Sequence, residues 1–126
     1  MKSRTFSILI VDDNGHYVKR MQTLLYEIEI IDKIHTAGNY EEATSKLSTE
    51  EHDFVLLDIN LPDGNGINLL KEIKDPVKKR NCEVIMISNQ NSPYYEKECK
   101  RLGAKYFLDK TNDFDKVPAL LASMYN

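Results

Sequence analysis

The spacing of hydrophobic residues changes repeatedly along the chain, and the changes predict alternating strands and helices. Near-continuous apolar runs at 6–11, 53–58 and 83–88 are too short for buried helices and include β-branched residues. Each of these runs predicts a strand that is buried on both faces. Shorter apolar runs at 33–37 and 106–108 predict two further strands.

Between these runs, apolar residues recur at the three- and four-residue spacing of a helix. The apolar stripes are Val18, Met21, Leu25 and Ile28; Tyr40, Ala43 and Leu47; Ile67, Leu70, Ile73 and Val77; and Val117, Leu120, Leu121 and Met124. Asn39 and Ser92 are predicted N-caps, and Gly103 suits a left-handed helix end. Pro76 is expected to end or bend the third helix in its last turn.

The alternation of five strands with five helices predicts an α/β fold with a doubly wound parallel sheet and helices on both faces. The expected strand order is the flavodoxin-like 2-1-3-4-5. Such sheets bind ligands at the carboxyl ends of their strands. The polar residues that end the strands are therefore the first candidates for function.

Composition and charge narrow the class of protein. A chain of 126 residues that is 41% hydrophobic suits one domain, expected over 1–126 with its core at about 5–124. The net charge of -3 argues against nucleic-acid binding. No apolar run approaches the roughly 18 residues of a membrane span, and no signal peptide is recognisable. We expect a cytoplasmic protein in which Cys82 and Cys99 are free thiols.

Four of the five predicted strands end in polar or charged residues, namely Asp12 and Asp13, Asp58, Ser88, and Asp109 and Lys110. The expected strand order makes the first and third strands neighbours and brings Asp12, Asp13 and Asp58 together. Carboxylates in one pocket repel one another, so they must bind a proton or share a cation. Oxygen ligands of this kind suit Mg²⁺.

The chemistry that fits this set of residues is phosphoryl transfer to a carboxylate. An Asp oxygen can act as the nucleophile and form an aspartyl-phosphate. A metal ion and Lys110 would neutralise the charge of the transferring group, and the Ser88 hydroxyl would donate a hydrogen bond. An ionised carboxylate needs no general base. The three histidines, His16, His35 and His52, lie away from the strand ends and are interpreted as surface or packing residues.

From about Thr5 to Met124, the chain resembles the receiver domain of two-component response regulators. The resemblance rests on the strand-end residues Asp12, Asp13, Asp58, Ser88 and Lys110, on the spacing of Pro62 and Gly66 after Asp58, and on the Gly103–Ala104 turn. It implies that Asp58 is the phosphoacceptor. It also implies an Mg²⁺ or Mn²⁺ site formed by Asp13 directly, Asp12 largely through water, Asp58, and the main-chain carbonyl of Asn60.

The resemblance also implies roles around the phosphoryl group. Ser88 and Lys110 would hold its oxygens, and Phe107 would be the aromatic switch that turns inward when Ser88 moves. Thr111 stands where the family often has proline after the lysine. The residues two beyond Asp58 and Ser88, Asn60 and Gln90, are expected to tune the lifetime of the phosphoryl group.

The expected function is a signalling switch rather than a turnover enzyme. The phosphoryl group would come from a histidine kinase or a histidine phosphotransfer protein. The signal would leave by onward phosphotransfer, as in a phosphorelay, or by protein contact at the fourth helix, fifth strand and fifth helix. No effector domain is expected. An aspartate-nucleophile phosphatase is one alternative, although Asn60 cannot serve as its acid-base group. A phosphorylation-independent interaction module is the other.

Overall fold

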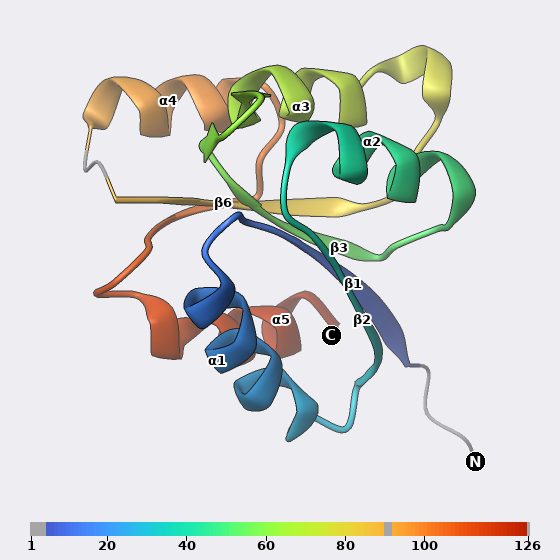
Figure 1. Cartoon of the computed structure of the whole chain (residues 1–126), viewed down its shortest axis with the longest axis vertical. Coiled ribbons are helices and arrows are strands. Elements are labelled where there is room, and N and C mark those ends of the chain that lie inside the picture. Colours follow the sequence, from blue (N-terminus) through green and yellow to red (C-terminus); the bar gives the residue numbers. More distant parts are fainter. Residues whose placement is uncertain (1–4, 90–91, 126) are drawn as a thin grey trace.

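The computed structural model describes residues 5–89 and 92–125, which form a parallel sheet covered by helices on both faces (Figure 1). The main sheet has five strands in the order β2 (Ile31–Ala37), β1 (Phe6–Val11), β3 (Phe54–Asp58), β6 (Glu83–Ser88) and β7 (Tyr106–Asp109). All of its pairings are parallel. The predicted fold class and strand order are therefore confirmed.

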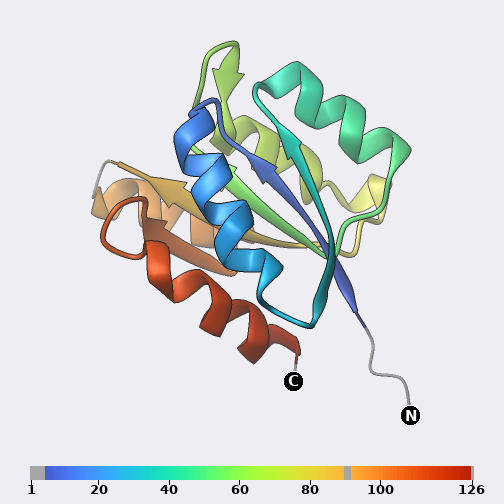
Figure 2. The same ribbon diagram turned by 60° about the horizontal axis from the view of Figure 1, so that its bottom comes forward.

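The helices divide into two layers around the sheet. Helices α1 (Gly15–Tyr26) and α5 (Val117–Tyr125) cover one face, and α2 (Tyr40–Thr49), α3 (Gly66–Ile73) and α4 (Pro93–Arg101) cover the other (Figures 1 and 2). Each layer encloses its own buried cluster. Alternate residues of β1 enter opposite clusters, with Ile8 and Ile10 on the α1 side and Leu9 and Val11 on the α2 side. This explains why the strands contain continuous apolar runs.

The predicted helix ends are found at Asn39, Ser92 and Gly103. The Asn39 side chain accepts a hydrogen bond of 2.8 Å from the Glu42 main-chain N–H, and Ser92 caps α4 in the same way. Gly103 has a φ of 107°, a conformation that is strained for residues with a side chain. The Glu42 carboxylate also accepts a hydrogen bond from the Gly38 N–H, which fixes the approach to α2.

The third helix is shorter than its apolar stripe predicted. Helix α3 ends at Ile73, and Val77 lies in a short 3₁₀ turn, η1 (Pro76–Lys78). Val77 is 84% exposed. Pro76 lacks the N–H that an α-helix requires, and the Asp75 side chain caps the turn by accepting a hydrogen bond from the Val77 N–H. The placement of Val77 on the buried stripe was therefore wrong.

The loop after β3 contains a small antiparallel hairpin of β4 (Asn60–Leu61) and β5 (Gly64–Asn65). The carboxylate of Asp63 accepts hydrogen bonds from the main-chain N–H groups of Tyr40 and Glu41. The hairpin is thereby anchored to the start of α2, and it holds the loop after Asp58 in one position.

The chain after β7 leads through a 3₁₀ turn, η2 (Phe114–Lys116), into α5. Pro118 lies in the first turn of α5, where its missing N–H breaks no hydrogen bond of the helix. Over the ranges 5–89 and 92–125, no helix is both long and apolar enough to span a bilayer.

Candidate functional site

Polar residues from four strands meet at the carboxyl edge of the sheet. Asp12 follows β1, Asp58 ends β3, Ser88 ends β6, and Lys110 follows β7. All four are buried, and only one other buried polar residue, His52, occurs in the described part of the chain. Burial of a polar or charged side chain is costly without partners, so this concentration marks the edge as a site rather than as ordinary surface.

Lys110 lies between the two buried carboxylates. Its Nζ atom is 2.7 Å from Asp12 Oδ2 and 3.3 Å from Asp58 Oδ2, and it donates a hydrogen bond to the latter. Nζ also lies 4.8 Å from the centroid of the Tyr17 ring, within the range of a cation–π contact. Lys110 follows β7, the last strand in the chain. It therefore links the ends of β1 and β3 at this edge.

The other oxygen of each buried carboxylate is held by the main chain. Asp12 Oδ1 accepts a hydrogen bond of 2.8 Å from the Asn14 N–H, and Asp58 Oδ1 accepts one of 3.2 Å from the Asn60 N–H. Asp13 is exposed, and one of its oxygens lies within 4.8 Å of oxygens from Asp12 and Asp58. The predicted convergence of these aspartates is present in the structure.

The electrostatic balance of the site favours a further cation. Burial raises the pKa of Asp58, and the neighbouring charge of Asp12 raises it further, against the opposing effects of Lys110 and the Asn60 N–H. Burial acts to lower the pKa of Lys110, but the hydrogen bonds and charges of Asp12 and Asp58 outweigh it and raise this pKa. One ammonium group therefore does not fully compensate the carboxylates around it.

The site has space and ligands for a hydrated ion. A hollow of about 500 Å³ opens over it and is lined by Asp13, Asn14, Asp58, Asn60, Leu61, Pro62, Asn89 and Lys110. Carboxylate, amide and carbonyl oxygens with room for water form the ligand environment that Mg²⁺ prefers. The residues present therefore fit the expected metal.

Gly66 allows the main chain to close tightly beneath Asp58. A Cβ atom on Gly66 would lie 2.2 Å from the Asp58 carbonyl oxygen and 2.8 Å from Ile59 Cα, distances that no side chain can occupy. The Gly66 N–H donates a hydrogen bond of 2.6 Å to the Ile59 carbonyl. The start of α3 thus packs directly against the end of β3.

Tyr17 is a residue of the site that the sequence reading missed. Its ring is buried below Lys110 and makes an edge contact with Phe114, with centroids 5.6 Å apart. Burial and the charges of Asp12 and Asp58 raise the pKa of Tyr17. The stripe predicted from the sequence began at Val18. In the structure, the buried face of α1 is formed by Tyr17, Met21 and Leu25. Their four-residue spacing was a usable signal.

The remaining predicted site residues lie on the β6 and β7 side. The Ser88 carbonyl accepts a hydrogen bond of 2.9 Å from the Lys110 N–H, which couples the ends of these two strands. Phe107 is half-buried and packs against the cluster that α2, α3 and α4 cover. The peptide bond between Lys110 and Thr111 is trans. Gln90 lies outside the described residues, while its neighbour Asn89 lines the hollow.

The two tyrosines that open α4 have different environments. Tyr94 is 70% exposed, whereas Tyr95 packs against the same buried cluster as Phe107. Their rings are in contact, with centroids 5.7 Å apart. This surface beside β7 therefore presents an aromatic side chain that is physically connected to the core.

Curated relatives share this region of sequence. The transcriptional activator EvgA of Escherichia coli K12 is 26% identical over 120 residues, which are 94% of this chain and 56% of EvgA. The protein-glutamate methylesterase/protein-glutamine glutaminase of Bacillus subtilis strain 168 is 34% identical over 105 residues, which are 82% of this chain and 29% of that protein. The chain spans about half the length of EvgA and less of the esterase.

Solved structures show the same fold. The receiver domain of Francisella response regulator 1452 has a TM-score of 0.84 at 25% identity, covering 96% of this chain and 97% of that one. The signal receiver domain of a DNA-binding response regulator from Colwellia psychrerythraea 34H has a TM-score of 0.88 at 24% identity, covering 94% and 97%. A family model described as the response regulator receiver domain matches residues 8–122. The chain therefore belongs to the family of response regulator receiver domains.

Proposed function

We propose that this receiver domain is a phosphoacceptor switch in which Asp58 takes a phosphoryl group in the presence of Mg²⁺. The observation that carries the proposal is the position of the Asp58 carboxylate. It is buried at the end of β3 between Asp12 and Lys110, and it borders an open hollow. A nucleophile held in this way needs no general base, and the hollow gives the donor a route to it.

The transfer forms one bond and breaks another. An Asp58 oxygen attacks the phosphorus of a phosphohistidine on a histidine kinase or phosphotransfer protein, and the phosphorus–nitrogen bond breaks. The imidazole nitrogen keeps the bonding electron pair and takes a proton from water. Lys110 already contacts Asp58 and is placed to follow the negative charge as it moves to the phosphoryl oxygens.

Asp12, Asp13, Asp58 and the main-chain carbonyl of Asn60 would hold the metal ion. Mg²⁺ supplies positive charge that offsets repulsion between an anionic donor and the carboxylates. Asp12 is fixed by the Asn14 N–H and Asp58 by the Asn60 N–H, so these ligands need little rearrangement. Asp13 is exposed, which suits a ligand that reaches an ion from the solvent side.

The output of the switch is proposed to leave through α4, β7 and α5. Ser88 would move toward the phosphoryl group, and Phe107 would turn into the space that it leaves. The hydrogen bond from Lys110 N–H to the Ser88 carbonyl supports this coupling, because it joins the two strand ends that contact the phosphoryl group. Exposed Tyr94 and the α5 surface then offer a binding site for a downstream protein.

The lifetime of the aspartyl-phosphate is proposed to depend on Asn60 and Gln90. Asn60 borders the hollow from which water would approach the phosphorus. An amide can orient or obstruct that water, but it cannot remove a proton from it. This is also the reason to propose a switch rather than a turnover phosphatase. We place the reaction in the cytoplasm, where the free thiols of Cys82 and Cys99 remain reduced.

The proposal is tested by intact-mass measurement after incubation with acetyl phosphate or phosphoramidate. Wild type in Mg²⁺ should gain one phosphoryl group. Asp58→Asn and wild type in excess chelator should gain none, and exposed Asp115→Asn should behave as wild type. Equal labelling of Asp58→Asn would overturn the assignment of the acceptor. A wild type that stays unlabelled with both donors would favour the phosphorylation-independent interaction module instead.

A further inference from the structure

A second cluster of ionisable side chains lies at the other end of β3, away from Asp58. It consists of His35 in β2, Glu50 directly after α2, and His52 shortly before β3. The length of β3 alone separates it from Asp58 by roughly 13 Å. The sequence predicted that the two histidines are surface or packing residues, and it did not indicate that they contact each other.

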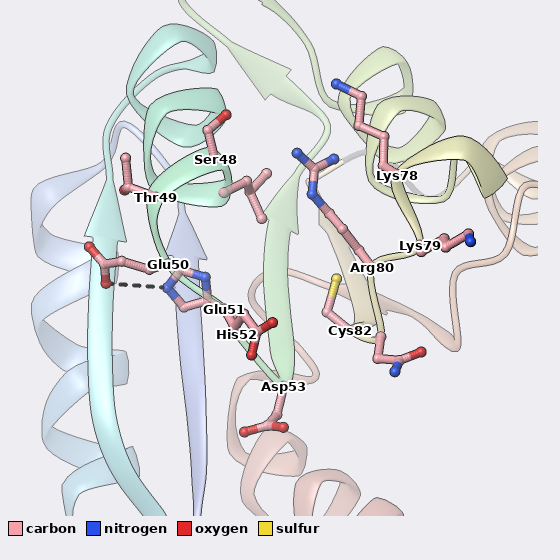
Figure 3. A pocket seen from close by; sticks show the side chains of 12 residues that line it. Ser48, Thr49, Glu50, Glu51, His52, Asp53, Lys78, Lys79, Arg80 and Cys82 are labelled. Atoms are coloured by element: carbon pink, nitrogen blue, oxygen red, sulfur yellow. Dashed lines mark ion pairs between the residues drawn. The ribbon is translucent and has the colours of Figure 1, made fainter.

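Three donor atoms converge in this cluster. His35 Nδ1 lies 2.7 Å from Glu50 Oε2 and 3.0 Å from His52 Nε2, and Glu50 Oε2 lies 4.0 Å from His52 Nε2. Figure 3 shows the Glu50 carboxylate and the His52 ring directed at one another. The two imidazole rings are nearly perpendicular, at 89°, with centroids 5.2 Å apart.

Protons satisfy this arrangement poorly. His35 Nδ1 must carry a proton because it lies close to the Glu50 carboxylate. This N–H can donate a well-aligned hydrogen bond to Glu50 or to His52, but not to both. His52 Nε2 is then an acceptor, and its own proton lies on Nδ1. That atom is buried without a hydrogen-bond partner among the residues that the structure describes. The side chain of His52 is 0% exposed. His52 Nδ1 keeps its proton when Nε2 binds an ion, so an ion would relieve the competition for the His35 proton and not the burial of Nδ1.

A divalent transition-metal ion satisfies all three atoms at once. Two imidazole nitrogens and one carboxylate oxygen form a common ligand set of Zn²⁺, and bonds of about 2.0–2.1 Å place tetrahedral ligands roughly 3.3 Å apart. The observed separations of 2.7, 3.0 and 4.0 Å bracket this spacing. Side-chain adjustments of less than 1 Å would therefore form the site, with a remaining coordination position for water.

The surroundings give an ion both access and favourable charge. His35 and Glu50 have side chains that are 30% and 34% exposed, and they border a hollow of about 480 Å³. This hollow is also lined by three further carboxylates and one lysine, namely Asp32, Glu51, Asp53 and Lys33. Lys46 approaches the other oxygen of Glu50, Oε1, at 3.9 Å and leaves Oε2 directed at the histidines. Glu50 and His52 also line a second hollow, and the basic residues Lys78, Lys79 and Arg80 lie on its opposite wall (Figure 3).

We propose that His35, Glu50 and His52 bind one Zn²⁺-class transition-metal ion, independently of the Mg²⁺ site at Asp58. Imidazole nitrogens select such ions over Mg²⁺, which prefers oxygen ligands. The ion would join the edge strand β2 to the segment between α2 and β3. Because it binds only the folded arrangement, it would stabilise the domain.

The experiment titrates the full chain with Zn²⁺ by calorimetry in excess Mg²⁺, and follows the histidine ring resonances by NMR. Wild type should bind one Zn²⁺ and shift the His35 and His52 signals but not those of His16. His35→Gln and Glu50→Gln should each weaken binding by at least about tenfold, since loss of even an outer-shell partner costs that much. Both replacements are at partly exposed positions, so folding is preserved and is checked by circular dichroism.

Matched controls separate this site from the rest of the protein. Exposed His16→Gln should bind Zn²⁺ as wild type does, and Asp13→Asn should retain Zn²⁺ binding while losing Mg²⁺ affinity. The proposal is overturned by unchanged affinity in His35→Gln, by loss of Zn²⁺ binding in Asp13→Asn, or by no saturable Zn²⁺ binding in wild type. Because Asp13→Asn changes only the proposed Mg²⁺ site, its separate Zn²⁺ and Mg²⁺ affinities show which of the two proposed sites is wrong.

Discussion

Gly66 lies so close to Asp58 that a Cβ atom on the glycine would stand 2.2 Å from the Asp58 carbonyl oxygen. The first residue of α3 is therefore in contact with the main chain that carries the proposed phosphoacceptor. The neighbouring atoms are backbone rather than flexible side chain, so they cannot move aside without displacing the end of β3.

Gly66→Ala should lower the free energy of unfolding by at least about 2 kcal/mol, since an added methyl group overpacks a backbone contact. It should also slow phosphorylation of Asp58 by displacing its carboxylate. Gly15→Ala is the matched control, because a Cβ there meets nothing within 4 Å and alanine favours the helix. Urea denaturation and intact-mass time courses measure both effects. Equal stability of the two variants would contradict the close contact.

Removal of Lys110 should destabilise the metal-free protein. Lys110→Met leaves Asp12 and Asp58 buried without their cation, and breaking such a buried pair costs about 3 kcal/mol. Mg²⁺ should restore more stability to this variant than to wild type, because the ion replaces part of the lost charge. Thermal unfolding in chelator and in Mg²⁺ tests this, with exposed Lys105→Met as the control. A variant as stable as wild type in chelator would show that Lys110 does not compensate the carboxylates.

Asp58→Asn should stabilise the domain in chelator, and increasingly so as the pH rises. Burial raises the folded-state pKa of Asp58 above its ordinary value of 3.8, so the folded protein holds that proton more tightly than the unfolded chain does. Wild type therefore loses stability as the pH rises from 3.8 through the raised pKa. The asparagine variant avoids this loss, so at neutral pH its melting temperature should be higher than that of wild type.

The measurement for Asp58 is thermal unfolding between pH 4 and pH 7, with exposed Asp115→Asn as the comparison. Near pH 4 the stability advantage of Asp58→Asn over wild type should be smallest, since the protonated fraction of the Asp58 carboxyl is highest at the low end of this pH range. An advantage that shrinks toward neutral pH would contradict the predicted direction of the pKa shift.

The Tyr17 ring, rather than its hydroxyl, should support Lys110. Tyr17→Leu loses the cation–π contact with Lys110 and the edge contact with Phe114, a cost of about 1–2 kcal/mol. Tyr17→Phe keeps both ring contacts and should stay close to wild type. Chemical denaturation of the two variants, with the Lys110 amide shift as a local probe, distinguishes them. Equal destabilisation would assign the role to the hydroxyl.

The sequence alone determined the architecture and the set of polar residues at the carboxyl edge. Short continuous apolar runs are buried on both faces, and strict alternation with helices permits only parallel strands with crossovers. Once the strands are parallel, residues that follow them must meet at one edge. Asp12, Asp58, Ser88 and Lys110 could therefore be predicted together without any contact being known.

Features that depend on packing were decided only by the tertiary structure. The four-residue spacing of Tyr17, Met21 and Leu25 could have placed Tyr17 on the buried face of α1, but its contacts with Phe114 and Lys110 come from distant parts of the chain. The effect of Pro76 on the third helix was predicted from the sequence, whereas the exposed position of Val77 after that helix was not.

The histidine cluster shows this dependence most clearly. His35 and His52 are 17 residues apart and have no recognisable metal-ligand spacing. They meet because β2 pairs with β1 in a register that sets His35 beside Leu9, while Glu50 and His52 lie where the chain passes from α2 to β3. Strand register and the path of a connection are properties of the whole packed domain. Local spacing determines the elements, and their packing determines which side chains become neighbours.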